Sequence, residues 1–406
     1  MQLPMMRNSE RNDFKECPQK WAWRWNERLT LAHPPQAGAL WFGTGYHLVW
    51  AEYYTPPKGT ENNPKRGFIR GRDPHETWDE FCGESYTKIA NADYFDEESE
   101  QEFIDAKELG HIMIAGQLKM WGGDPQFEVL MPEQRFAIGI KYTVDQIERM
   151  ANLTMAGGTG TNVAVKVVGT YDMPVRDHAD ETSSIKIIDW KTTSKQARQK
   201  QLNKDGQTGT YILSGTAALR RAGLITEKER ISGMIFSFAR KAKPPENVDE
   251  NGVVRNKPLK AHFQDEFDRL GIPYQKKDSL VVLQFIADKN EIKVWGERSK
   301  RQGNPLFWRE VIIRNEANMK SQARHIAEEA EVMGKMRAGL LPIYKSPGEH
   351  CNWCVFSDLC DIDEDGGDTE EFKKYMFTKD DPYADHRSGA LNSKVTVQNK
   401  KETGVQ

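Results

Sequence analysis

Two hydrophobic patterns alternate along this chain and separate expected helices from expected strands. Apolar residues that recur every three or four positions favour amphipathic helices, and short β-branched or alternating runs favour strands. We expect a helix beginning near residue 9 and further helices over 37–54, 76–93, 97–121, 202–222 and 310–337. We expect strands over 127–131, 135–140, 163–174, 184–193, 231–238 and 279–283, the first two forming a hairpin or strand pair.

The strand over 184–193 carries candidate chemistry. Three isoleucines suit a buried strand, and Asp189 and Lys191 point to the same side because side chains alternate with period two. The strand over 163–174 reaches Asp172 near its end, and a polar turn makes the two strands a neighbouring antiparallel pair. An offset hairpin or a bend would let the two carboxylates converge. Asp189 and Lys191 could hold a metal and a reacting water, or form a simple ion pair at a sheet edge.

The segments between these elements suggest four regions. Residues 240–262 are rich in Pro, Lys and Asn and predict a surface insertion, as 55–75 and 155–161 predict a loop and a turn. Residues 384–406 almost lack aliphatic side chains, which is typical of disorder. We therefore expect an N-terminal helical region (1–125), a strand-rich core (126–240), a region with the insertion, a long helix and clustered cysteines (241–361), and an acidic, then disordered tail (362–406).

Composition narrows the class of protein. The chain has 406 residues, 57 basic and 60 acidic, for a net charge of −3, so a nucleic-acid site would have to be a local groove. No apolar run approaches the roughly 18 residues of a membrane span, and the N-terminus lacks the apolar core of a signal peptide. We expect a cytoplasmic protein without a membrane partner, in which disulfides are rare.

Three of the five cysteines fall within ten residues, as Cys351, Cys354 and Cys360, with the spacing C-x2-C-x5-C. Thiols two residues apart can face one centre, so this spacing favours a metal or cluster site. The residues alone leave Cys17, His350 and Cys82 as candidates for a fourth ligand. Cys82 is most simply a small buried hydrophobe, and His47, on an apolar helix, is on its own more typical of a core histidine.

Taken together, six motifs in order resemble a RecB-like nuclease of the PD-(D/E)XK superfamily. They are Cys17-Pro, Gly45-x-His47, Gly169-Thr-Tyr-Asp172, Ile188-Asp189-Trp190-Lys191-Thr, Gln207-x3-Tyr211 and the C-terminal C-x2-C-x5-C. The resemblance covers residues 8–361 and is closest to the iron–sulfur branch, which includes CRISPR-associated four-cysteine exonucleases and AddB-type nuclease domains. Where that family often has a glutamate four residues after its histidine, this chain has Ala51. The neighbouring Glu52 is therefore left out of the expected site.

The resemblance implies a restriction-endonuclease-like α/β core with helical additions. It also implies a 4Fe–4S cluster that joins the two ends of the chain. The implied cluster ligands are Cys17, Cys351, Cys354 and Cys360, and Cys82 is excluded.

The resemblance further implies Mg²⁺ or Mn²⁺ held by His47, Asp172, Asp189 and the carbonyl of Trp190, with the imidazole favouring Mn²⁺. Lys191 would orient the water. Gln207 and Tyr211 would brace the site or touch the DNA.

The implied activity is a metal-dependent DNA exonuclease acting on single-stranded ends in recombination, repair or phage DNA processing, in a bacterial cell or phage-infected host. The chain carries no helicase P-loop, so unwinding would need a helicase or recombination partner. Two alternatives remain open: a non-catalytic DNA-binding or scaffold subunit of the same fold, and a nuclease whose four thiols hold zinc. The polarity of digestion and the oligomeric state do not follow from the residues.

Overall fold

The computed structural model describes residues 4–33, 37–57, 60, 68–90, 95–130, 134–141, 146, 163–194, 199–245, 247–300 and 305–387. The expected turn at 155–161, part of the expected loop at 55–75 and the tail beyond 387 lie outside the described residues. Within the described residues, no helix is both long and apolar enough to cross a membrane. The division into four regions stays a prediction.

A five-stranded mixed sheet lies at the centre, with strand order β3-β6-β7-β8-β9. Only the β7–β8 pair is parallel in this sheet, and its crossover contains helix α8 (Gly206–Arg221). The central strand β7 begins with six consecutive buried residues, as expected for a strand covered on both faces. The strands are β3 (Phe127–Val129), β6 (Met173–Asp177), β7 (Ile185–Thr193), β8 (Ile231–Arg240) and β9 (Phe307–Ile313).

A second sheet, with order β1-β5-β4, corrects two strand expectations. Its strands are β1 (Met5–Met6), β4 (Gln134–Lys141) and β5 (Val163–Tyr171). The expected pair of 127–131 with 135–140 is wrong, because β3 and β4 lie in different sheets. The single strand expected over 163–174 is also wrong, because the chain leaves the second sheet at Tyr171 and enters the central sheet at Met173.

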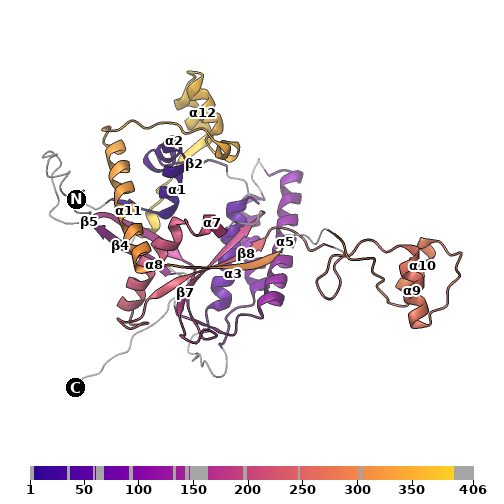
Figure 1. Ribbon diagram of the computed structural model, residues 1–406. Coiled ribbons are helices and arrows are strands. Elements are labelled where there is room, and N and C mark those ends of the chain that lie inside the picture. The colour runs from indigo at the N-terminus through magenta and orange to yellow at the C-terminus, as the bar shows by residue number, and fades with distance from the viewer. Residues whose placement is uncertain are drawn as a thin grey trace.

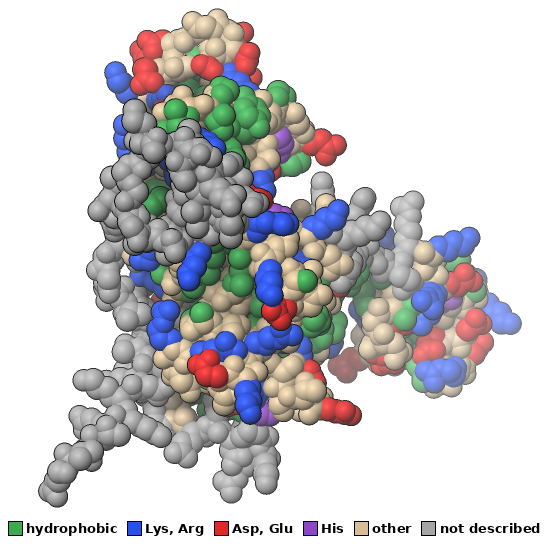
Figure 2. All heavy atoms as spheres, turned by 60° about the vertical axis from the view of Figure 1, so that its left-hand side comes forward, with side chains coloured by type: hydrophobic (Ala, Val, Ile, Leu, Met, Phe, Trp, Pro, Cys, Tyr) green, Lys and Arg blue, Asp and Glu red, His purple; other side chains and the backbone are tan. Residues whose placement is uncertain are grey.

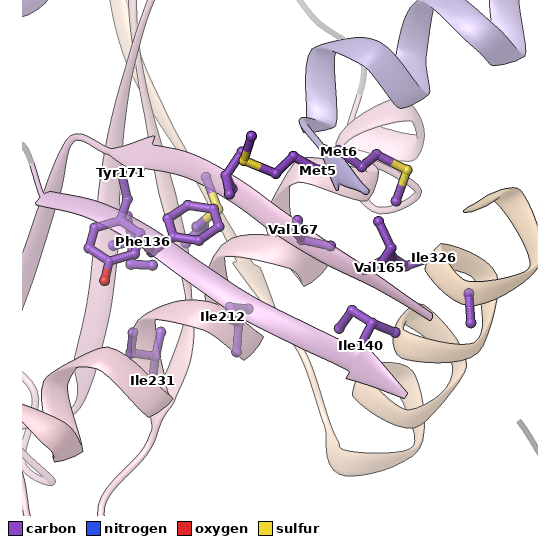
Figure 3. Packing of buried hydrophobic residues seen from close by; sticks show 14 of the residues in the cluster. Met5, Met6, Phe136, Ile140, Val165, Val167, Tyr171, Ile212, Ile231 and Ile326 are labelled. Carbon is purple, nitrogen blue, oxygen red and sulfur yellow. The ribbon is translucent and has the colours of Figure 1, made fainter. Parts of the chain in front are cut away.

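Helices cover both faces of the central sheet. On one face, α3 (Ala39–Tyr54), α4 (Pro74–Ile89) and α5 (Glu97–Trp121) pack against a cluster that includes Ile188 and Trp190. On the other face, α8, the long helix α11 (Glu316–Arg337) and the second sheet enclose a cluster that includes Ile185 and Ile187. Figure 3 shows side chains of this second cluster converging from β1, β4, β5, α8 and α11. The alternation along β7 therefore divides the core into two clusters.

The two ends of the described chain meet in a cap above the sheet (Figure 1). Strand β10 (Phe377–Lys379) pairs with β2 (Leu29–Leu31), and Trp23, Phe356, Leu359 and Phe377 share one buried cluster. Helices and a strand continue past residue 362, and of the tail expected to be disordered over 384–406 only residues 384–387 are described, as a short helix. The other elements of the two ends are α1 (Asn8–Glu16), α2 (Pro18–Trp21), η1 (Ala22–Asn26), η2 (Glu349–Trp353), α12 (Ser357–Glu364), α13 (Thr369–Met376) and α14 (Ala384–Arg387).

The segment between β8 and β9 leaves the body as a small helical lobe (Figure 1). Helices α9 (Lys260–Leu270) and α10 (Leu280–Lys289) share their own apolar cluster. The strand expected over 279–283 is wrong, since Ser279 caps α10 by accepting a hydrogen bond from the Val282 N–H. The long helix expected from 310 begins only at Glu316, because 307–313 form β9. The short helix α7 (Gln199–Leu202) precedes α8.

Candidate active site

The bend between the two sheets places Asp172 beside the central strand. Met173 pairs with Ile188 across β6 and β7, so Asp172 lies next to Asp189 in the same register. The Oδ2 atom of Asp172 accepts a hydrogen bond of 3.0 Å from the Trp190 backbone N–H. The two carboxylates therefore come together through a bend, which was one of the two arrangements that the sequence allowed; the other was an offset hairpin.

Asp189 and Lys191 lie on the same side of β7, as their spacing predicts. The Lys191 Nζ atom is 2.6 Å from Asp189 Oδ2, and the Asp189 side chain is only 1% exposed. Burial raises the pKa of Asp189, Lys191 lowers it and Asp172 raises it further, to about 6. Burial lowers the pKa of Lys191, but the charges of Asp189 and Asp172 raise it above its usual range, so the ammonium stays charged.

His47 reaches the same point from α3. Its Nδ1 atom is 3.1 Å from Asp172 Oδ2, and its ring meets the Trp190 indole edge to face at 6.4 Å. Burial lowers the pKa of His47, but the Asp172 carboxylate more than offsets this and raises it to about 9. Burial likewise raises the pKa of Asp172, while His47 and Lys191 lower it below its usual value. His47 and Asp172 thus form an ion pair at neutral pH.

Gln207 bridges the other side of the site from the first turn of α8. Its Nε2 atom donates to Asp189 Oδ1 at 3.0 Å, and its Oε1 accepts from Lys191 Nζ at 3.4 Å. Asp205 caps α8 by accepting a hydrogen bond from the Gln207 N–H. This cap fixes the backbone position from which the Gln207 side chain extends. Gln207 therefore contacts both charged residues of β7.

Tyr211 lies one turn further along α8. Its ring packs edge-on against Tyr171 at 6.1 Å and against Phe136 at 5.7 Å, in the wall of the cavity described next. The structure brings His47, Asp172, Asp189, Lys191 and Gln207 together and places Tyr211 beside them.

A cavity of about 830 Å³ opens onto this constellation. His47, Asp172, Gln207 and Tyr211 are among the residues that line it. Its size falls in the range of ligand sites that hold a nucleotide-sized group. The sequence did not identify three further lining residues, Arg7, Arg135 and His386. They lie far apart along the chain, so no local motif could have marked them.

The donor types at this site fit a divalent cation. Two carboxylates and an imidazole are ligands that Mg²⁺ or Mn²⁺ sites use, and the Asp189 carboxylate is almost fully buried with the Lys191 ammonium against its Oδ2 atom. In the described residues, the carboxylates instead face His47 and Lys191, and no three His, Cys, Asp or Glu side chains are already arranged around one ion. A cation held by Asp172 and Asp189 would replace the positive charge of His47, whose ring would have to lose its proton to bind the metal.

Four of the five cysteines gather in the cap. Cys17 lies between α1 and α2, Cys351 and Cys354 lie in and after η2, and Cys360 lies in α12. Burial raises the pKa of Cys354, and the neighbouring thiols of Cys17 and Cys351 add to this. Burial also raises the pKa of Cys360, again with Cys17 as a neighbour. The fifth, Cys82, is buried in α4 within a different cluster.

The family model of the PD-(D/E)XK nuclease superfamily matches residues 8–361, a span that contains every candidate residue of the site and of the cysteine cap. No curated protein matches the sequence.

Proposed function

Because the chain belongs to the PD-(D/E)XK nuclease superfamily, we propose that it is a metal-dependent DNA exonuclease that acts on single-stranded ends. One observation carries the proposal. The bend at Asp172 brings its carboxylate beside Asp189 and Lys191, where the Trp190 N–H and His47 hold it. Asp172, Asp189 and Lys191 supply the two acidic residues and the lysine that the superfamily's name denotes, and Asp172 lines the cavity.

Each residue has a role in phosphodiester hydrolysis. His47, Asp172, Asp189 and the Trp190 carbonyl would hold Mg²⁺ or Mn²⁺. The cation would stabilise the charge that develops on the attacked phosphate and the leaving oxygen. Lys191, whose ammonium stays charged beside Asp189, would orient the attacking water and offset phosphate charge. Gln207 fixes the positions of Asp189 and Lys191, and Tyr211 supplies an aromatic wall beside the DNA.

The test is digestion of end-labelled single- and double-stranded DNA with Mn²⁺ or Mg²⁺, beside circular single-stranded DNA. We expect shortening of linear single strands and no cutting of circles, and Asp189→Ala should abolish cleavage while retaining DNA binding. Cleavage of circular DNA would show that the protein is an endonuclease rather than an exonuclease, because circular DNA has no ends. Equal cleavage by wild type and Asp189→Ala would contradict the proposal that this site catalyses the reaction. DNA binding without any cleavage would favour a non-catalytic scaffold subunit.

We also propose that Cys17, Cys351, Cys354 and Cys360 hold a 4Fe–4S cluster. Their gathering in the cap, away from Cys82, supports this assignment. Protein purified without oxygen should be brown, with absorbance near ~400 nm, a property of iron–sulfur clusters. A colourless protein that carries zinc would show that the thiols form a structural zinc site instead. Because no P-loop is present, a helicase or recombination partner would open duplex DNA.

A further inference from the structure

Basic residues also line the candidate cavity. Arg7, Arg135 and His386 line the same cavity as His47 and Asp172 but belong to three other parts of the fold. Arg7 immediately precedes α1, Arg135 lies on β4 and His386 lies in α14. Asp172 lines this cavity as a carboxylate, and the two arginines bring to it the positive charge that a phosphate group requires.

His386 reaches the cavity on a segment that returns from the cysteine cap. We call residues 377–387 the strap. It begins at Phe377 in the buried cluster of the cap and continues as β10, which pairs with β2. The Asp380 N–H then donates to the Arg28 carbonyl at 3.0 Å. The first residues of the strap are therefore hydrogen-bonded to the N-terminal part of the chain.

Tyr383 anchors the last part of the strap beside the cavity. Its hydroxyl donates to the buried carboxylate of Glu10, and its ring packs against Trp25 with centroids 5.8 Å apart. The Arg7 guanidinium lies over the same ring at 5.9 Å. The His386 N–H donates to the Tyr383 carbonyl at 2.9 Å. One anchor thus positions both Arg7 and His386, and the strap lies beyond residue 361, where the family match ends.

We propose that Arg7, Arg135 and His386 bind the phosphate of a nucleotide next to the cleaved bond, so that the strap completes the binding groove. This rests on the proposed nuclease function and specifies how its strand is held. A strand whose scissile phosphate lies at the carboxylates must place a neighbouring phosphate elsewhere in or beside the cavity. Figure 2 shows Lys and Arg side chains over the middle of the body, with Asp and Glu side chains among them.

The test compares Arg135→Ala and His386→Ala with Lys379→Ala. Lys379 is an exposed cation on the strap that does not line the cavity, so its variant is a matched loss of charge. Affinity for a fluorescent single-stranded oligonucleotide is measured in the Asp189→Ala background, over a salt series. We expect Arg135→Ala and His386→Ala to weaken binding ~5-fold or more, and Arg135→Ala to lower the salt slope by about 1. His386→Gln, which keeps a donor, should recover part of the affinity.

With Asp189 intact, the same two variants should raise KM and leave kcat within about twofold, because they remove binding rather than chemistry. Equal affinities for Arg135→Ala, His386→Ala and Lys379→Ala would overturn the proposal while leaving the nuclease in place. Conversely, suppose that the variants bind DNA more weakly but the wild-type protein cleaves no DNA. This result would support the proposed phosphate contacts and contradict the proposed exonuclease activity. Thermal unfolding of each variant identifies any loss of affinity that comes from misfolding.

Discussion

At the scale of single residues, each buried carboxylate of the candidate site is paired with one basic side chain. His47 neutralises Asp172, and Lys191 neutralises Asp189, so two buried carboxylates remain compatible with the core. Gln207 adds one donor and one acceptor between them. A cation would take the place of the charge on His47, while Lys191 would stay beside Asp189.

Gln207→Leu tests whether this bridge positions the reacting groups. The change keeps the approximate volume and removes both hydrogen bonds, so Asp189 and Lys191 lose a fixed separation. We expect kcat to fall ~10-fold to ~100-fold with KM nearly unchanged. Steady-state cleavage of a labelled single strand measures both constants, and a melting curve like that of wild type is the control. An unchanged kcat would show that Gln207 contacts the site without contributing to the reaction.

His47→Ala tests the choice of cation. An imidazole ligand favours Mn²⁺ over Mg²⁺, which strongly prefers oxygen. We expect cleavage with Mn²⁺ to fall more than cleavage with Mg²⁺, which would narrow the difference between the two metals. Titrating each metal against the cleavage rate gives the comparison, and His178→Ala, a histidine paired with Glu128 outside the cavity, is the control. Equal losses with both metals would assign His47 to holding Asp172 rather than to the cation.

The sequence could predict part of this site and not the rest. The alternation along 184–193 placed Asp189 and Lys191 on one side, which needs only local geometry. The position of Asp172 depends on a change of sheet between Tyr171 and Met173, and no local pattern states with which strand a segment will pair. Arg7, Arg135 and His386 meet at one cavity only through the tertiary structure.

At the scale of elements, α3 is held by a buried network at its C-terminal end. The Tyr54 hydroxyl donates to Asp124, which also forms a bidentate ion pair with Arg309 at 2.6 Å for both contacts. The Tyr54 ring stacks on Trp190 with centroids 5.7 Å apart. Since Tyr54 and His47 lie on the same helix, this network fixes α3 against β7 two turns from the site.

Tyr54→Phe distinguishes the contribution of the Tyr54 hydrogen bond from that of its ring stacking. The phenylalanine keeps the stack on Trp190 and removes one donor to buried Asp124, which retains Arg309. We expect the free energy of unfolding to fall by about 1 kcal/mol, with kcat close to wild type. Tyr54→Leu also removes the stack and should lower both stability and kcat. Denaturant unfolding and cleavage rates measure the two effects, and equal stability of all three proteins would contradict the role of the network.

The strand expected over 279–283 shows why short apolar runs mislead. Four apolar residues suit a buried strand or a helix equally well, and length and caps decide between them. Here Ser279 caps a helix whose Leu283 and Ala287 bury one face, while Val281 and Phe285 stay exposed. The long run at β7 carried enough length and β-branching to be unambiguous. Element type was thus predictable where the pattern was long, and element pairing was not.

At the scale of the whole molecule, the cap joins segments that lie more than three hundred residues apart. Cys17 and Cys360 lie in the same cap, and β2 pairs with β10 beside them. Phe356, Leu359 and Phe377 pack with Trp23 and Leu29 under the thiols. The apolar cluster and the strand pair join the two ends through contacts that do not use the thiols, so a cluster would add to these contacts.

This arrangement predicts a graded response to loss of the cluster. Cys17→Ala should remove the absorbance near ~400 nm and lower the melting temperature, because the two ends lose a covalent tie. It should not unfold the central sheet, whose core lies in other clusters. Because the strap runs from the cap to the cavity, affinity for single-stranded DNA should fall more than kcat. Cys82→Ala, which removes a thiol outside the cap, should keep the colour. Retained colour in Cys17→Ala would contradict the ligand assignment.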